Sequence, residues 1–327
     1  MDRIKIGEIA KAYGFCDFGI CSIEAFEEQK QVIDSQPWLK ERDHLKFSPM
    51  QDYPWASSLI VLLWSYAPAS LPSEDEVFVD SYYLASNRAY HAAADFAAHL
   101  QKEGYHAQAN VSYPARTAAL RAGLGITGHN GMVIHPKYGS RVVIILVATD
   151  AAESLVDHTE TSECLRCGRC VTACPTGAID RNGMCHPERC LRNFMMEGCV
   201  VPEETREKFG MKLIGCDVCQ RVCPMQPRIA SEEGQLFTLD AFMTLDTHEF
   251  RSKLDALSEL IGRNVARPQR VRAQLALLAA NRKKPSYVPI LKEWANSPHD
   301  AVREHAIWAL SKIEENQLTL DQTREKR

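Results

Sequence analysis

Cysteines at regular spacing dominate the middle of this 327-residue chain, and ten of its twelve cysteines fall between Cys164 and Cys223. The first run has the spacing C-x2-C-x2-C-x3-C-P and consists of Cys164, Cys167, Cys170, Cys174 and Pro175. With this spacing three thiolates hold one [4Fe-4S] cluster, and the fourth reaches across to a second cluster. The run therefore predicts iron–sulfur chemistry, and with it electron transfer or reduction.

A second run, Cys216-x2-Cys219-x3-Cys223-Pro224, repeats this pattern with one cysteine fewer, and Cys190 is the best candidate to complete the set. We expect one cluster on Cys164, Cys167, Cys170 and Cys223, and the other on Cys174, Cys190, Cys216 and Cys219. Cys185 is the main rival to Cys190, and Cys199 stays unassigned. Zinc is the alternative because C-x2-C pairs also bind zinc, but the long run with a trailing proline is more specific for clusters.

Bulk composition agrees with a soluble globular protein of two or three domains. Hydrophobic residues make up 45%, charged residues 24%, and the net charge is −4, so any nucleic-acid surface must be local. We find no apolar run of about 18 residues and no apolar signal-peptide core. The expected compartment is the cytoplasm, where a dense cysteine block binds metal more often than it forms disulfides.

Hydrophobic patterning predicts an α+β fold. Residues 59–63, 132–134 and 141–148 are expected as strands, and residues 90–103 and 116–121 as helices. Residues 239–315 carry successive short apolar stripes at helical spacing, which indicates stacked helical repeats, with an ordinary small helical bundle as the alternative. The expected domains are 1–155, 156–230 and 231–327, with a polar tail.

One motif in the first domain is misleading. Gly123, Gly125 and Gly128 match G-x-G-x-x-G, which in dinucleotide-binding proteins follows a strand and opens a helix. Here a helix is expected before the motif and a strand after it. We therefore reject a dinucleotide site and expect a tight backbone loop.

Several segments together resemble a known family. The clearest is Gly215-Cys-Asp-Val-Cys-Gln-Arg-Val-Cys-Pro224, with Cys-Pro-Thr-Gly-Ala178 upstream. Weaker matches in the right order are Tyr13-Gly-Phe-Cys-Asp-Phe-Gly-Ile20, Tyr90-His91, Ala122-Gly-Leu-Gly125, Tyr138-Gly-Ser140 and Arg303-Glu-His-Ala-Ile-Trp-Ala-Leu310. Along nearly its whole length the chain resembles the epoxyqueuosine reductases, which are cobalamin-dependent two-cluster enzymes that complete the queuosine base in tRNA.

The resemblance implies a nitroreductase-like α/β domain holding base-off cobalamin, a bacterial ferredoxin-like two-cluster module and C-terminal HEAT-like repeats. It implies an oxidoreductase that reduces a tRNA-borne epoxide, supplied with electrons by an external donor such as flavodoxin or ferredoxin. The expected corrinoid contacts are His129, Asn130, Gly139 and Ser140. A monomer without membrane contact is expected.

The sequence departs from the family at its catalytic acid. The family has an aspartate in a D-x-x-P setting, whereas the segment here is Ala109-Asn-Val-Ser-Tyr-Pro114. Tyr113 is the expected replacement proton donor, with Arg116 lowering its pKa. The family's lysine in G-x-x-G-K is replaced by His129. Two alternatives therefore stay open: a cobalamin-dependent reductase of another small molecule, similar to reductive dehalogenases, and a non-catalytic corrinoid or electron carrier.

A basic stretch precedes the C-terminal helices. Residues 260–292 contain no Asp or Glu but carry Arg263, Arg267, Arg270, Arg272, Arg282, Lys283, Lys284 and Lys292. Phosphate backbones bind such local positive patches by counterion release. A solvated helix face is the alternative, and the family resemblance favours tRNA.

Overall fold

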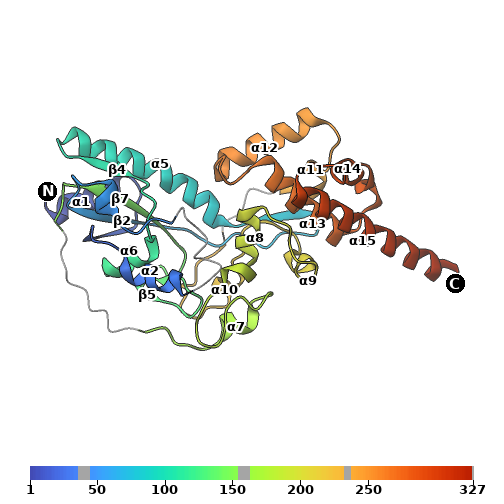
Figure 1. The fold of residues 1–327 in the computed structure, drawn as a ribbon, viewed down its shortest axis with the longest axis horizontal. Helices are drawn as coiled ribbons and strands as arrows, with labels where there is room; N and C mark the ends of the chain where they lie inside the picture. The colour runs from blue at the N-terminus through green and yellow to red at the C-terminus, as the bar shows by residue number, and fades with distance from the viewer. Residues whose placement is uncertain (36–44, 154–162, 232–236, 326–327) are drawn as a thin grey trace.

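The computed structural model describes residues 1–35, 45–153, 163–231 and 237–325. Figure 1 shows an elongated molecule with the α/β part at one end, the cysteine loops near the centre and the helical repeats at the other end. The N-terminus lies in the α/β part and the C-terminus at the far end of the repeats. The expected domain boundary at 155/156 lies outside the described residues.

A four-stranded antiparallel sheet forms the centre of the α/β part. Its strands, in the order β1-β2-β7-β4, are β1 (Asp17–Ser22), β2 (Ser58–Ser65), β7 (Val142–Thr149) and β4 (Ala107–Ala109). The first six residues of β2 are all buried, so both faces of the sheet are covered. The predicted strands 59–63 and 141–148 are β2 and β7.

Helices cover both faces of this sheet. One face packs against α1 (Arg3–Ala12) and α5 (Ser81–Lys102), and the other against α6 (Ala115–Arg121), next to α2 (Glu27–Asp34) and α4 (Pro49–Asp52). Helix α5 begins earlier than the expected residue 90 because the Asp80 side chain caps it by accepting a hydrogen bond from the Tyr82 amide. Alanines at 85, 89, 93 and 97 are buried along one side and let the helix lie close to the sheet.

The glycine motif forms a loop between helix and strand, as predicted. Helix α6 precedes it, and the two-stranded hairpin of β5 (Ile126–Thr127) and β6 (Val133–Ile134) follows. Gly125 has φ +150°, and a Cβ there would lie 2.5 Å from the carbonyl oxygen of Ile134. Only glycine fits this approach.

The cysteine module consists of short elements. They are α7 (Arg169–Ala173), α8 (Leu191–Glu197), α9 (Glu203–Arg206), β8 (Lys212–Ile214) and α10 (Val218–Arg221), with 3-10 turns at Pro187–Arg189 and Glu207–Phe209. Helices α7 and α10 pack together and carry the cysteine loops. Leu191, Met195, Phe209 and Leu213 are instead buried in the same hydrophobic core as the helical repeats. The second half of the module therefore supports the repeats.

A small sheet joins all three parts of the chain. Strand β3 (Glu76–Val79) of the α/β part pairs in parallel with β8 of the cysteine module and antiparallel with β9 (Phe237–Thr238), which precedes the repeats. The three expected domains are therefore linked by backbone hydrogen bonds as well as by side-chain packing.

The C-terminal part is helical, as predicted. Its elements are α11 (Leu239–Phe242), α12 (Thr247–Ile261), α13 (Pro268–Arg282), a 3-10 turn (Pro285–Tyr287), α14 (Val288–Trp294) and α15 (Asp300–Glu325). Helix α13 is buried over nearly its whole circumference and packs along α15. Helix α15 continues past residue 315, where the apolar pattern ends. None of the helices in the described ranges is long and apolar enough to cross a membrane.

Candidate functional site

The first cysteine set lines a pocket beside the α/β part. Its members Cys164, Cys167, Cys170 and Cys223 share the pocket wall with Pro224, His129 and Asn130. Burial raises the pKa of the Cys170 thiol and of the Cys223 thiol. The charges of Cys164 and Cys167 lie close enough to raise both pKa values further. The structure thus brings together the four thiols that the spacing assigns to one cluster.

The second set gathers around Cys219. Burial raises the pKa of this thiol, and the neighbouring charges of Cys216, Cys190 and Cys174 raise it further. Burial likewise raises the pKa of Cys216 to about 11. Thiolates crowded together out of water repel one another. Thiols that coordinate iron are deprotonated, and the positive charge of the bound iron offsets the repulsion between them. The burial and crowding fit thiolate ligands of a cluster.

Cys185 lies at the edge of the second set. Burial raises its pKa to about 11, followed by the charge of Cys190, while Arg116 acts in the opposite direction. Its Cβ is 3.4 Å from the position that a Cβ on Gly131 would take. Proximity alone therefore leaves Cys185 and Cys190 as rivals for the fourth ligand position.

A buried cation beside the first pocket also suits an anionic cluster. The Arg141 side chain is 5% exposed, and its Nε has no hydrogen-bond partner among the described residues. It lies near enough to Cys223 to lower the pKa of that thiol against the larger effect of burial.

Across the described ranges, no three His, Cys, Asp or Glu side chains converge on a single-ion site.

Two of the expected corrinoid contacts lie against the cysteines. His129 donates its backbone N–H to Sγ of Cys164 at 3.4 Å. The Asn130 side chain acts to lower the pKa of the Cys219 thiol, against the larger effect of burial. The His129 ring lies 3.0 Å, through Nε2, from the carbonyl oxygen of Asp180. These two residues thus connect the α/β part to both cysteine sets.

The other two expected contacts, Gly139 and Ser140, are covered by the cysteine module. The Ser140 amide donates to Oε1 of Gln226 at 3.2 Å, and its hydroxyl accepts from the Gln226 side chain. A Cβ on Gly139 would lie 2.2 Å from Gln226 Oε1. Gln220 adds a bond to the Ser140 carbonyl at 2.7 Å. In the structure both residues lie at the junction between the two parts, and their expected contact with a corrinoid stays a prediction.

The expected pairing of Tyr113 with Arg116 is wrong. The Tyr113 hydroxyl donates to Asp52 at the end of α4, and Asp52 also pairs with Lys46 at 2.8 Å. Arg116 donates instead to the carbonyl oxygen of Gly131. Burial and the Asp52 carboxylate raise the pKa of Tyr113, whereas a cation was expected to lower it.

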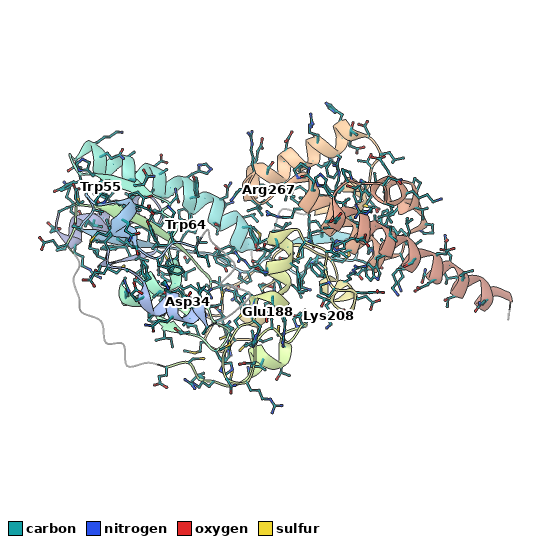
Figure 2. All side chains as sticks on the ribbon, viewed as in Figure 1. Asp34, Trp55, Trp64, Glu188, Lys208 and Arg267 are labelled. Carbon is teal, nitrogen blue, oxygen red and sulfur yellow. The ribbon has the colours of Figure 1, made fainter. Side chains whose placement is uncertain are left out.

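The basic stretch divides into two groups. Arg263, Arg267, Lys283 and Lys292 are exposed and form no ion pair with the described residues. Arg267 lies at the start of α13, on the side of the repeats where the end of α12 approaches α5 (Figure 2). Arg270 donates to two backbone carbonyls, and Arg272 lies 4.6 Å from the ring centre of Phe250.

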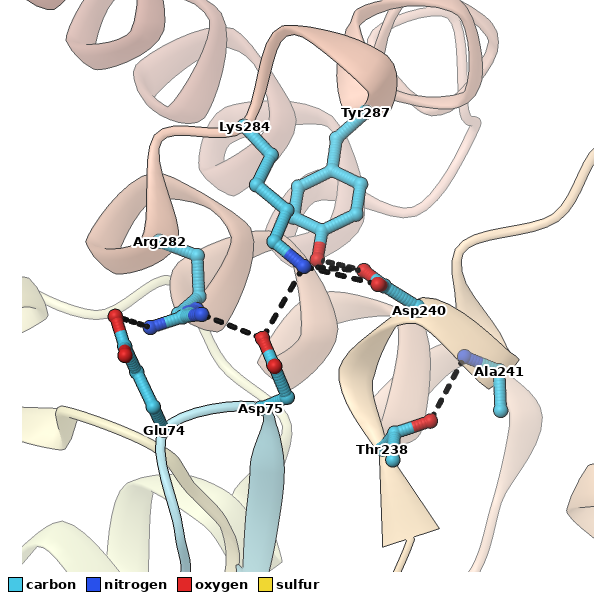
Figure 3. Close-up of polar contacts among 8 residues, drawn as sticks. All are labelled: Glu74, Asp75, Thr238, Asp240, Ala241, Arg282, Lys284 and Tyr287. Atoms are coloured by element: carbon cyan, nitrogen blue, oxygen red, sulfur yellow. Dashed lines mark hydrogen bonds and ion pairs between the residues drawn. The ribbon is translucent and has the colours of Figure 1, made fainter.

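Arg282 and Lys284 form internal ion pairs, which corrects their expected place in a phosphate-binding stretch. Arg282 reaches Glu74 at 3.1 Å and Asp75 at 2.6 Å (Figure 3). Lys284 lies 3.2 Å from Asp75 and 2.9 Å from Asp240 (Figure 3). Glu74 and Asp75 lie in the turn before β3, and Asp240 lies in α11. These acids are distant in sequence from Arg282 and Lys284, so no local pattern reveals the pairing. For the same reason, no local pattern in the sequence pointed to four other residues near the site: Asp52, Arg141, Gln220 and Gln226.

Comparison with known proteins matches two parts of the chain to family models. Residues 163–226 match a 4Fe-4S double cluster binding domain, and residues 254–321 match HEAT repeats. Both expectations for these parts of the fold are confirmed.

Individual relatives extend the likeness. An epoxyqueuosine reductase of Bacillus subtilis is 32% identical over 61% of this chain, a match that spans about half (53%) of that protein. One of Bacillus cereus is 26% identical over 95% of this chain and 90% of its own length. A crystal structure of epoxyqueuosine reductase with an epoxyqueuosine-modified tRNA-Tyr stem loop has TM-score 0.80 at 24% identity, covering 95% of this chain and 90% of the other. The chain is thus similar in sequence to bacterial epoxyqueuosine reductases and has their fold.

Proposed function

We propose that this chain is an iron–sulfur-dependent reductase that acts on epoxyqueuosine in tRNA or on a closely related epoxide. The gathering of the two cysteine sets against the α/β part is the observation that most supports it. One [4Fe-4S] cluster would be held by Cys164, Cys167, Cys170 and Cys223, and the other by Cys174, Cys190, Cys216 and Cys219. Electrons would enter from an external carrier such as flavodoxin or ferredoxin.

Cobalamin is the proposed cofactor of the α/β part. Its support is the family resemblance, which extends over the whole α/β part. Of the four expected contacts, Gly139 and Ser140 are engaged by Gln226, and His129 and Asn130 lie against the cysteines. Residues other than these four would have to hold most of the corrinoid. Binding is measured from the visible spectrum of the purified protein mixed with cobalamin.

Tyr113 is the proposed proton donor, and Asp52 holds its hydroxyl in place. The phenol stacks on Phe26 with ring centres 6.5 Å apart and contacts Tyr53 edge-on at 6.3 Å. Because the raised pKa keeps the phenol protonated at neutral pH, its proton is available to a strongly basic alkoxide such as that of an opening epoxide. Donation would leave a phenolate beside the Asp52 carboxylate, and Lys46 would partly offset that charge.

The exposed cations Arg263, Arg267, Lys283 and Lys292 are the proposed contacts to tRNA phosphates. They come from the ends of α12, α13 and α14 and face solvent, whereas the other four cations of the stretch are engaged within the protein.

The test is turnover of an epoxyqueuosine-containing tRNA stem loop by anaerobically purified protein supplied with cobalamin and dithionite. Chromatography of the released nucleosides follows loss of the epoxide, and Cys219→Ser is the matched control. Complete conversion by the wild type and none by the control supports the proposal. A wild type that accepts electrons but leaves the nucleoside unchanged would favour a reductase of another small molecule, to which the missing aspartate points.

A further inference from the structure

The eight proposed cluster ligands differ in how close they lie to the surface. Cys167 is exposed, whereas the other seven are half-buried or buried. In the second set, Cys216 packs against the hydrophobic core of the repeats, and Cys190 is followed by Leu191, which is 2% exposed. The second set therefore lies deeper in the protein, and the first set presents the exposed ligand.

Arginines surround this exposed ligand. Arg166 and Arg169 lie on either side of Cys167 in the chain, and both side chains are exposed. Arg228 is exposed as well and follows three residues after Met225, which lines the same pocket as Cys167. The ion pairs within the described part of the cysteine module all involve other residues. The three arginines are therefore available to an external anion.

An apolar side chain lies among these charges. Leu165 is 65% exposed and also contributes to the wall of the first pocket. The loops 163–170 and 223–231 together carry the three arginines and a single acid, Glu163. An exposed apolar contact with unpaired cations around it suits a small, transient interface with a protein of opposite charge.

The position of this surface separates it from the proposed tRNA contacts. Helix α7, which begins at Arg169, lies at an outer edge of the molecule, on the side away from α5 and α12 (Figure 1). The proposed tRNA contacts come from the ends of α12, α13 and α14. Because electron tunnelling weakens steeply with distance, a carrier must dock where a cluster approaches the surface, and the exposed Cys167 marks that place.

We propose that Leu165, Arg166, Arg169 and Arg228 form, around Cys167, the docking surface of a small acidic one-electron carrier protein. Each encounter moves one electron: the carrier is oxidised by one electron and the first cluster is reduced by one, with no bond made or broken. Two encounters supply the two electrons that removal of an epoxide oxygen requires. The inference rests on the cluster part of the proposed function and is independent of the substrate.

The experiment measures how fast a reduced plant-type ferredoxin, as the acidic carrier, reduces the clusters of anaerobic protein. Freeze-quench electron paramagnetic resonance separates the signal of the carrier from that of the four-iron clusters. Arg166→Glu/Arg169→Glu reverses the charges beside the exposed ligand, and Arg228→Glu reverses a charge outside both cysteine runs. Lys102→Glu/Arg251→Glu is the matched control, since these are exposed cations of α5 and α12. Iron, sulfide and full reduction by excess dithionite are measured for each protein first.

At low salt we expect the control to be reduced as fast as the wild type, Arg228→Glu to be slower, and the double arginine variant to be slower by about tenfold or more. Added salt should slow the wild type and bring the rates together, because it screens the attraction. If the double variant lacks a cluster, Arg228→Glu alone decides.

Equal rates for the wild type and the arginine variants, or no reduction of the wild type by the ferredoxin, would overturn the inference. So would competition between the tRNA stem loop and the ferredoxin, because the arginines would then hold RNA. Charge-dependent reduction of the clusters without turnover of the stem loop would contradict the proposed substrate and leave this inference standing.

Discussion

The cysteine loops and the basic stretch at 260–292 both stand out in the sequence by composition, yet the structure uses them differently. The cysteines of each expected set lie near one another, as their spacing requires. The basic stretch instead divides, with Arg282 and Lys284 held by Asp75, just before β3, and by Asp240 of α11. The spacing within each cysteine run is a local signal that predicts the ligand sets, whereas the availability of a surface cation depends on residues far away in the chain.

The largest expected effect concerns the one uncertain member of the cysteine sets. Cys190→Ser should remove one of the two clusters, because a hydroxyl is a poor substitute for a thiolate ligand. Cys185→Ser should keep both clusters, although Cys185 lies beside the same set. Iron and sulfide analysis of the two purified variants distinguishes them. The reverse result would make Cys185 the ligand and show that sequence spacing misleads within the module.

A buried histidine makes stability depend on pH through a long-range contact. His305 of α15 is fully buried, accepts a hydrogen bond from the Val201 amide at 3.0 Å and lies 3.0 Å, through Nδ1, from the Ala273 carbonyl. Burial lowers its pKa from 6.5 to about 4. The free energy of unfolding therefore keeps the contribution of neutral His305 above pH 6.5. It falls by about 3 kcal/mol as the pH falls towards 4, because the unfolded state binds the proton first.

Denaturation midpoints between pH 7 and pH 4.5 measure this effect. His305→Phe cannot titrate, so its midpoint should fall less with acid than that of the wild type, although it is less stable at pH 7. Parallel curves for the two proteins would mean that His305 does not carry the acid sensitivity of the repeat core.

Sequence reasoning predicted the fold where local signals were strong. The apolar runs of β2 and β7, the reversed order around the glycine motif and the helical stripes of the repeats all appear in the structure. It did not anticipate the β8-β3-β9 sheet, because each strand has only two to four residues and pairs across distant parts of the chain. The Asp52–Tyr113 contact spans 61 residues and was hidden for the same reason.

The hydrogen-bond partner of Tyr113 could not be predicted from nearby residues. In the structure the partner is Asp52, which lies 61 residues away in the sequence. Tyr113→Phe should lower turnover of the stem loop at least tenfold, since general acid catalysis typically contributes about 10²–10⁴-fold, without changing cluster content. Asp52→Asn should lower the pKa of Tyr113, because it removes the carboxylate that holds the proton on the phenol. Ultraviolet titration of the phenol, compared with Tyr113→Phe, checks the second point. Unchanged turnover in Tyr113→Phe would leave His129 as the next candidate donor.

The smallest expected effect separates the two groups of the basic stretch. Replacing Arg263 and Arg267 together with alanine should weaken tRNA binding and reduce its salt dependence by about 2 in the log–log slope. Replacing Arg282 and Lys284 should leave the slope nearly unchanged, since their charges are already engaged by Glu74, Asp75 and Asp240. Equal slopes for the two double variants would contradict the division drawn from the structure.

Iron and sulfide content of anaerobically purified wild-type protein is the most direct test of the cluster assignment, on which the proposed function depends. Two [4Fe-4S] clusters predict about eight iron and about eight sulfide per chain. Two zinc ions per chain without sulfide would contradict the account.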